Sequence, residues 1–302
     1  MTVISFKELA DWRPSRVTYG VVGSPVAHSF SPAMHGAAMS SMGVEADYLA
    51  FEIPPADLRA GLDLLGRAGV RGLNLTVPHK APAVALVDEL SDEARLVRAV
   101  NVMVFGKDGR RIGHNTDARG FSRAIREEFQ LPLSELKVMI LGAGGAGRAV
   151  ALQAARERAE RIVIANRTFE KAEALVREIA PSYLDDKLEG QAARLRALSL
   201  ETSALASEVD GIDLIVNTTS VGLAPGDPSP LAAHLIRPHH LIYDTIYSPA
   251  RTPLLEAAGE TNARGANGLS MLLHQGVLSL ELWLGRPGPV DVMRRALRRA
   301  AG

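Results

Sequence analysis

Short apolar runs alternate with longer amphipathic segments along almost the whole chain. The strand-like runs of the first part are VTYGVVG (17–23), DYLAFEI (47–53), RGLNLTV (71–77), NVMVFG (101–106) and RRIGHN (110–115). Helical periodicity fills the intervals 32–42 and 56–68. Lys107-Asp108-Gly109, between the last two runs, suits a hairpin turn. The alternation of strands and helices predicts an α/β fold with a parallel sheet.

The middle of the chain repeats this alternation more strongly. Its strand-like runs are KVMILG (137–142), RIVIAN (161–166), GIDLIVN (211–217) and HLIYDTI (240–246). The segment 180–206 is polar and poorly patterned, and we expect variable helix and loop there. A long helix is predicted from Gly268 through Trp283, followed by a Gly-Pro-rich break and a short basic helix, DVMRRALRRA.

Composition narrows the class of protein. A chain of 302 residues is long enough for two domains with separate cores. Its 34 basic and 34 acidic residues balance, so no overall field attracts nucleic acid or an anionic membrane, and a small molecule is the expected partner. With no cysteine there is no disulfide or thiol nucleophile. No signal peptide or membrane span is predicted, and the cytoplasm is the expected compartment.

A glycine-rich turn follows the strand KVMILG and leads directly into a helix. Gly142, Gly144 and Gly147 fit the G-x-G-x-x-G spacing, with Gly145 and Ala146 between them. Such a turn brings a pyrophosphate onto a helix N-terminus. Glycines also end strands for steric reasons alone, but the strand before and the helix after favour a dinucleotide site.

The end of the next strand indicates which dinucleotide. An NAD site would place a carboxylate there, whereas this chain has Asn166, Arg167 and Thr168, with Lys171 a turn later. Two cations and a hydroxyl suit a 2′-phosphate, so NADP is the predicted cofactor. The alternative is a helix capped by Thr168 among solvated charges.

Polar residues also gather at other predicted strand ends, where ligands bind in open α/β sheets. The patches are GSPVAHSFSPAMHG with Ser29 and Ser31, Thr76-Val77-Pro78-His79-Lys80, Asn101, Asn115-Thr116-Asp117, and Tyr247-Ser248-Pro249. His28 and His35 in the first patch show no metal-ligand spacing with the other histidines, and no metal is assigned.

Taken in order, these patches resemble the shikimate dehydrogenase family along nearly the full length of the chain. The matching pieces are GSPVAHSFSPAMHG, NLTVPHK, AVN, HNTDARG, the GAGGAGRA turn, NRTFEKA, NTTSVGL, DTIYSPARTPLL and NGLSMLLHQG. The resemblance implies reversible NADPH-linked reduction of 3-dehydroshikimate to shikimate, on the route to aromatic amino acids. It also implies two α/β domains with the active site in a cleft between them.

The long C-terminal helix would return the chain to its first domain. We therefore expect a discontinuous substrate-binding domain, 1–117 and 268–302, and a Rossmann-like NADP-binding domain, 118–267.

The resemblance also implies roles for individual residues of the site. Ser29 and Ser31 match the serines that hold the substrate carboxylate, and Lys80 matches the catalytic lysine. The other positions that match substrate contacts are Thr76, Asn101, Asp117, Tyr247 and Gln275. Tyr247 would bond the substrate carboxylate or only fill the wall of the cleft. Positions expected near the cofactor are Thr218, Ser220 and Gly268, although loop structure alone also explains the first two.

Elementary chemistry supports these roles and leaves alternatives. Pro32 suits a first helical position, which would make Ser31 the N-cap, yet capping does not account for Ser29. Lys80 is the expected proton donor and acceptor at the reacting oxygen; burial should lower its pKa while Asp117 opposes that shift. Otherwise Lys80 is a surface lysine on the first turn of a helix.

The chain departs from the family at two positions beside Asn101. Arg98 stands where the family commonly has glycine, and Val102 where it has threonine. Three hypotheses therefore remain: shikimate dehydrogenase, a relative acting on quinate or another cyclic polyol acid, and a non-catalytic binding or regulatory paralogue. The sequence is compatible with a monomer or a homodimer.

Overall fold

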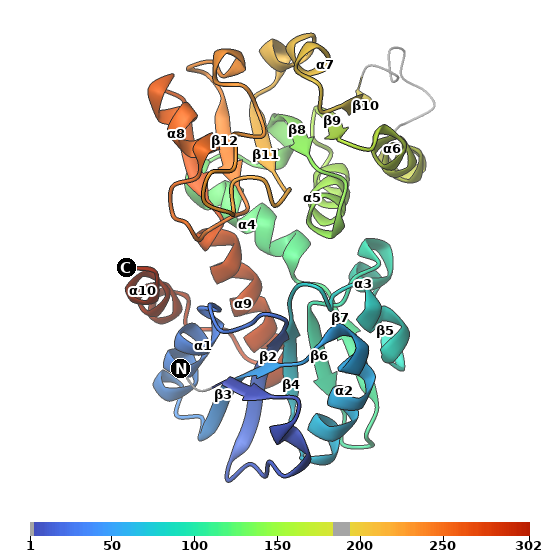
Figure 1. Ribbon diagram of the computed structural model, residues 1–302, viewed down its shortest axis with the longest axis vertical. Helices are drawn as coiled ribbons and strands as arrows, with labels where there is room; N and C mark the ends of the chain where they lie inside the picture. The colour runs from blue at the N-terminus through green and yellow to red at the C-terminus, as the bar shows by residue number, and fades with distance from the viewer. Residues whose placement is uncertain (1–2, 184–193) are drawn as a thin grey trace. The chain divides into compact units, whose positions relative to one another are not determined.

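The computed structural model describes residues 3–183 and 194–302, and the chain divides into two compact units (Figure 1). Unit 1 combines the residues up to Thr116 with Leu272–Gly302, and unit 2 is Asp117–Met271. The α/β fold class is confirmed in both units, because each has a sheet connected by helices.

Unit 1 contains a mixed seven-stranded sheet of order β1-β3-β2-β4-β6-β7-β5. Its strands are β1 (Val3–Ser5), β2 (Val17–Gly23), β3 (Ala46–Glu52), β4 (Gly72–Leu75), β5 (Glu89–Leu90), β6 (Val102–Phe105) and β7 (Arg111–His114). The expected parallel arrangement holds for β1 to β4. The predicted hairpin is confirmed, with Val102 opposite His114, and it makes β6 antiparallel to both neighbours.

Helices cover both faces of this sheet. They are α1 (Ser31–Ser41), α2 (Leu58–Arg67), α3 (Asp92–Val97), α10 (Val290–Ala301) and the part of α9 (Leu269–Leu284) that begins at Leu272. Short 3-10 turns lie at Glu8–Ala10, Pro55–Asp57 and Pro82–Leu86. Leu62 and Leu65 of α2 share an apolar core with Leu73 of β4. On the other face, a Cβ at Gly72 would lie 2.3 Å from Trp283 Nε1, so the close approach of α9 to β4 requires glycine.

Unit 2 is a doubly wound fold. Its parallel strands are β8 (Lys137–Leu141), β9 (Arg161–Asn166), β10 (Leu195–Ser199), β11 (Leu214–Asn217), β12 (Leu241–Asp244) and β13 (Arg264–Asn267). The order β10-β9-β8-β11-β12-β13 is that of a Rossmann fold, with β8 and β11 flanking the point where the winding reverses. Ligands bind outside the carboxyl ends of strands at such a point.

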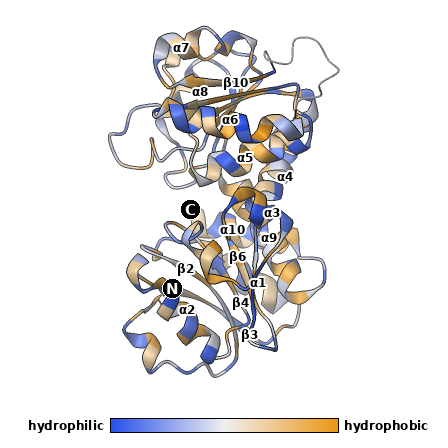
Figure 2. Cartoon of the chain, turned by 90° about the vertical axis from the view of Figure 1, so that its right-hand side faces the viewer, coloured by the Kyte–Doolittle hydropathy of each residue, from blue (hydrophilic) through white to orange (hydrophobic). Residues whose placement is uncertain are grey.

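The helices of unit 2 lie on both faces of its sheet. They are α4 (Asp117–Phe129), α5 (Gly145–Arg156), α6 (Phe169–Tyr183), α7 (Thr202–Ala206) and α8 (Pro253–Glu260), with 3-10 turns at Leu133–Glu135, Val209–Gly211 and Ala233–Leu235. Figure 2 shows polar and apolar residues side by side on α6, whose buried positions are Ala172, Leu175, Ile179 and Tyr183. This spacing of three and four residues places one helical stripe against the sheet.

The segment 180–206 only partly agrees with the expectation of variable helix and loop: the end of α6 and the whole of α7 are helical, but a strand lies between them. Residues 184–193 lie outside the described part of the chain, but Leu195–Ser199 forms the edge strand β10. The run LRALS is too short and too mixed to be recognised by periodicity, and its pairing with β9 stabilises it as a strand. No helix among the described residues is long and apolar enough to cross a membrane.

Candidate functional site

The loops that follow β2 and β4 are held side by side by backbone hydrogen bonds. Thr76 N donates to Val22 O at 2.9 Å, and Ser24 N donates to Val77 O at 3.2 Å. A Cβ at Gly23 would lie 2.6 Å from Thr76 Cγ2, so the two loops approach as closely as glycine permits. The segment that carries Ser29 and Ser31 therefore leaves the sheet beside the segment that carries Thr76 and Lys80.

The prediction that Ser31 caps α1 is wrong. The backbone is already helical at Phe30 (φ −82°, ψ −7°), so Ser31 is the first residue of the helix and Pro32 the second. Ser29 Oγ accepts a hydrogen bond from Ser31 N at 3.3 Å. The Ser31 side chain is buried and hydrogen-bonds to the phenol of Tyr48. Burial raises the pKa of this phenol strongly, and the hydrogen bond with Ser31 lowers it. Capping of α1 therefore does not account for Ser31.

Asn101 lies at the centre of a buried hydrogen-bond network. Its Nδ2 donates to Thr116 Oγ1 at 2.9 Å, and its Oδ1 accepts from Thr116 N at 2.8 Å. The same Nδ2 lies 3.4 Å from Gln275 Oε1, while Gln275 Nε2 donates to Leu272 O of its own helix. Two of the predicted substrate residues, one directly before β6 and one on α9, are thus brought together in unit 1.

The network continues through residues that the sequence analysis did not single out. Ser279 Oγ lies 3.3 Å from Thr116 Oγ1 and accepts from Asn74 Nδ2 at 3.0 Å. Asn74 Oδ1 in turn accepts from Tyr48 OH at 2.7 Å. A chain of buried polar groups therefore extends from Ser31 through Tyr48 and Asn74 to Asn101. The signal in the sequence was a polar residue inside an otherwise apolar run: Asn74 within RGLNLTV and Ser279 within VLSLELW.

Lys80 lies in a turn and not on a helix, because the following 3-10 turn begins only at Pro82. Its side chain is half-buried, and its carbonyl accepts from Val100 N at 2.8 Å, which anchors it next to Asn101. His79 fixes the same turn: it is fully buried, its Nε2 lies 2.7 Å from Ile53 O, and burial lowers its pKa. Asp117 is buried, begins α4 and directly follows Thr116.

The glycine-rich turn of unit 2 has the geometry of a phosphate cradle. Gly142 has φ +109°, and a Cβ at Gly147 would lie 2.1 Å from Gly142 O, so both positions require glycine. Gly144 and Gly145 are exposed, and among the described residues no atom lies within 4 Å of a Cβ built on either and no side chain caps α5. Ala146 follows in the first turn. The amides at this helix N-terminus are thus open to a pyrophosphate.

The end of β9 carries cations and an amide. Asn166 Oδ1 accepts from Ala143 N at 3.0 Å and its Nδ2 donates to Thr168 O at 2.8 Å, so this amide holds the glycine-rich turn in place. Arg167, Thr168 and Lys171 are exposed. The two cationic side chains form no hydrogen bond or ion pair with any residue that the structure describes. These residues fit the 2′-phosphate of NADP.

The remaining expected cofactor residues shape the backbone at this edge of unit 2. Thr218 Oγ1 donates to Leu141 O at 2.8 Å and thereby joins β11 to the glycine-rich turn. A Cβ at Gly268 would lie 2.1 Å from Thr245 O, which leaves no room for a side chain. Ser220 is exposed. Tyr247, after β12, is half-buried and burial raises the pKa of its phenol.

The two departures from the family pattern have structural explanations. Arg98 is exposed and ends α3 with φ +54°, a left-handed conformation that glycine adopts without strain. Val102 is fully buried as the first residue of β6.

Histidines form no metal centre in the parts of the chain that the structure describes. No group of three or more His, Cys, Asp or Glu side chains that could hold a metal occurs among these residues. His28 is exposed, whereas His35 is fully buried with its ring stacked on Tyr48 at a centroid distance of 4.4 Å.

Family models match three stretches that together cover most of the chain. Residues 21–103 match the shikimate dehydrogenase substrate binding domain, 124–218 the shikimate/quinate 5-dehydrogenase model, and 268–298 the shikimate 5′-dehydrogenase C-terminal domain. Among curated proteins, the NADP(+) shikimate dehydrogenase of Methanopyrus kandleri is 41% identical over 280 residues, 92% of this chain and 93% of that protein.

Solved structures are similar over the same span. The shikimate dehydrogenase of Thermus thermophilus in complex with NADP(H) and shikimate is 38% identical, with a TM-score of 0.81, and the match covers 94% of this chain and 99% of that one. The quinate dehydrogenase of Corynebacterium glutamicum in complex with NAD also has a TM-score of 0.81 over 94% and 99% of the two chains, but at 28% identity.

Proposed function

The chain belongs to the shikimate dehydrogenase family, and from this premise we propose that it catalyses the reversible NADPH-linked reduction of 3-dehydroshikimate to shikimate. The observation that carries the proposal is the buried network that joins Asn101, Thr116 and Gln275 beside the Thr76–Lys80 turn. A preorganised network of polar groups of this kind suits a substrate with several hydroxyl groups.

The proposed mechanism separates the hydride from the proton. Bound NADPH supplies the hydride. The Lys80 ammonium donates a proton to the oxygen of the substrate ketone, and in the reverse direction the amine takes it back. Asp117 acts with Lys80 as one acid–base pair, in which its carboxylate orients the ammonium. Half-burial of the lysine side chain supports this role, because a solvated lysine would not be held against a substrate.

Substrate binding is assigned to both ends of the network. The hydroxyls of Ser29 and Ser31 hold the substrate carboxylate through charge-assisted hydrogen bonds. Thr76, Asn101 and Gln275 bind the ring hydroxyls, and Tyr247 bonds the carboxylate. We assign residues 1–117 and 268–302 to substrate binding and 118–267 to NADP binding.

Cofactor binding is assigned to the carboxyl edge of the Rossmann sheet. The amides of the glycine-rich turn would hold the pyrophosphate, and Arg167, Thr168 and Lys171 would hold the 2′-phosphate. Thr218, Ser220 and Gly268 would border the nicotinamide half. The proposal places the enzyme in the cytoplasm as a monomer or homodimer.

Quinate is the second candidate substrate, favoured by the similarity to a quinate dehydrogenase structure. The two substrates differ at the ring, where a site that bonds a particular hydroxyl discriminates strongly. Purified protein is assayed with shikimate or quinate, each with NADP or NAD, by absorbance of the reduced nicotinamide. We expect the highest kcat/KM with shikimate and NADP.

Two outcomes of the same assay would contradict the proposed function. Turnover with quinate alone would make this chain a quinate dehydrogenase. Cofactor binding without turnover of either acid would indicate a non-catalytic paralogue.

A further inference from the structure

A cavity lies in unit 1 at the opposite end of the strands that carry the candidate site. Thr76 follows the carboxyl end of β4, and Asn101 precedes β6 at that same edge. The cavity lies where β4 begins and β6 ends, next to the C-terminal end of α2, and has a volume of about 510 Å³. We name it the basic cavity; it is lined by Asp63, Gly66, Arg67, Gly69, Val70, Arg71, Phe105, Gly106, Lys107, Gly109 and Arg111.

Four cationic side chains and one carboxylate line the basic cavity. The carboxylate, Asp63, forms an ion pair with Arg111 and is thereby neutralised. The side chains of Arg67, Arg71 and Lys107 form no hydrogen bond or ion pair with any residue that the structure describes. Three positive charges therefore face one cavity without a carboxylate partner among the described residues, in a chain whose basic and acidic residues balance overall.

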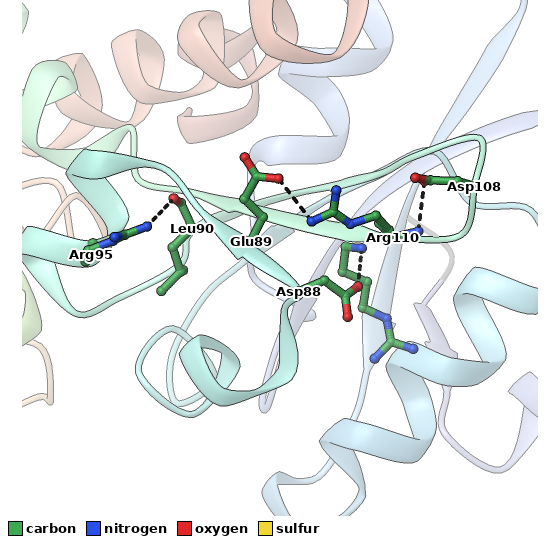
Figure 3. Close-up of polar contacts among 7 residues, drawn as sticks. Asp88, Glu89, Leu90, Arg95, Asp108 and Arg110 are labelled. Carbon is green, nitrogen blue, oxygen red and sulfur yellow. Dashed lines mark hydrogen bonds and ion pairs between the residues drawn. The ribbon is translucent and has the colours of Figure 1, made fainter.

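Three acids near the β6–β7 turn are engaged outside the cavity. Figure 3 shows Glu89 paired with Arg110, at 3.3 Å, and Asp108 accepting from Arg110 N at 3.1 Å. Asp88 accepts from Arg111 N at 2.7 Å. These three carboxylates are not part of the cavity lining, so they leave its positive charge in place.

Glycines keep the cavity open. Gly69 and Gly109 both have φ +84°, and no described atom lies within 4 Å of a Cβ built on either. Phe105, whose ring lies 3.1 Å from a Cβ built on Gly66, adds an apolar wall. The cavity thus offers guanidinium and ammonium groups beside a small apolar surface, within the usual size range of metabolite sites.

Compensation of the α2 dipole explains only part of this arrangement. Arg67 lies in the last turn of α2, where a cation is favourable. Arg71 precedes β4 and Lys107 lies in the β6–β7 turn, so neither belongs to that helix.

We propose that the basic cavity binds a phosphate dianion, either free or as a phosphomonoester. Guanidinium groups bind phosphate in a bidentate manner, and two arginines with a lysine match its charge. The site is separate from the candidate active site and from the residues proposed for NADP, so the inference does not depend on the proposed function.

The test is a titration of the full-length ¹⁵N-labelled protein with inorganic phosphate or phenyl phosphate, at constant ionic strength, followed by TROSY spectra. We expect saturable shifts of the Gly66, Gly69, Gly106 and Gly109 amides with one common Kd. Tighter binding of phenyl phosphate would identify a phosphomonoester site, and equal binding a site for free phosphate.

Variants separate this cavity from other cationic surfaces. The double variant Arg71→Gln/Lys107→Gln should weaken binding by about 10-fold or more, since charge-assisted hydrogen bonds contribute about 1.5–3 kcal/mol. Arg67→Gln alone gives a second readout if the double variant does not fold. Arg59→Gln, an exposed arginine of α2 outside the cavity, is the matched control and should bind normally.

Three results would overturn the proposal. The first is unsaturable shifts. The second is an equal loss of affinity in Arg59→Gln. The third is a response confined to Gly142–Gly147, which would assign the anion to the glycine-rich turn instead.

Discussion

The side-chain nitrogen Nδ2 of Asn101 lies 3.4 Å from the side-chain oxygen Oε1 of Gln275, although 174 positions separate the two residues along the chain. Ser279, one turn further along α9, connects the same pair to Asn74 through hydrogen bonds. The orientation of two proposed substrate ligands therefore depends on a serine that does not itself belong to the proposed binding set.

Ser279→Ala tests this positioning role. The substitution removes the acceptor for Asn74 and the contact to Thr116, so we expect a loss of about 1–3 kcal/mol in the free energy of unfolding. The KM for shikimate should rise several-fold while the KM for NADP stays unchanged. Ser270→Ala in the same helix is the matched control, because Ser270 is also buried but contacts Tyr243 of unit 2. A shikimate KM equally raised in both variants would contradict positioning by Ser279.

Lys80→Ala should lower kcat by roughly 10²- to 10⁴-fold, the usual contribution of acid–base catalysis, with a smaller change in KM. Steady-state kinetics with shikimate and NADP measure both constants. Lys7→Ala, at an exposed lysine, serves as the control and should retain full activity. A Lys80 variant with near-normal kcat would exclude this lysine from the mechanism.

Arg167→Ala should raise the KM for NADP by about 10-fold or more and leave the KM for NAD nearly unchanged, because only NADP carries the 2′-phosphate that we assign to this guanidinium. The comparison is made against Arg177→Ala on α6, whose side chain is paired with Glu173 at 2.8 Å. Equal losses with both cofactors would show that Arg167 acts on the fold of the loop and not on the 2′-phosphate.

His35 should make the protein sensitive to acid. Burial lowers the pKa of His35 to about 3, and neither ring nitrogen has a hydrogen-bond partner among the residues described. In the unfolded chain the pKa returns to about 6.5, so the unfolded state binds the extra proton between these values. The stability is therefore present above pH 6.5 and falls by about 1.4 kcal/mol for each unit of pH below it.

His35→Phe keeps the stacking on Tyr48 and removes the titrating group. Urea unfolding should give a pH slope about 1.4 kcal/mol per unit smaller than in the wild type between about pH 4 and 6, and the wild-type slope between about pH 7 and 8. Met34→Leu, a neighbouring buried substitution, controls for repacking and should keep the wild-type slope. An unchanged slope in His35→Phe would mean that other groups govern acid unfolding.

The left-handed backbone at Arg98 predicts that glycine is more stable than alanine at this position. Because its backbone is left-handed, Arg98→Gly should be more stable than Arg98→Ala by about 1 kcal/mol. The alanine variant removes the same guanidinium and keeps the Cβ, so the difference isolates backbone strain. Thermal unfolding of the two variants measures it, and equal midpoints would contradict strain at this position.

Sequence patterns predicted the strands correctly where both faces of a strand are buried. The runs 17–23 and 161–166 coincide with β2 and β9, because a strand covered on both faces is continuously apolar. By contrast β13, with the sequence RGAN, contains no branched apolar residue and forms a strand only because β12 lies beside it.

In the candidate site, too, the sequence predicted some residues and missed others. Motifs identified Asn101 and Gln275 individually, but the hydrogen bonds that join them to Tyr48, Asn74 and Ser279 follow only from the packing of α9 on the sheet. The error at Ser31 has a local cause. A shift of one residue at the start of α1 moved the serine from the cap into the helix, and such a shift depends on the backbone angles of Phe30.

Unit 1 is assembled from both ends of the polypeptide, and this has a consequence for its synthesis on the ribosome. The sheet face bearing Gly72 and Asn74 is translated before unit 2, yet Ser279 and Trp283, which pack on it, are translated after unit 2. Unit 2 is complete before them. Until α9 has been synthesised, the nascent chain therefore lacks the helix that packs on this face of the sheet, and unit 1 cannot complete its fold before unit 2 has been made.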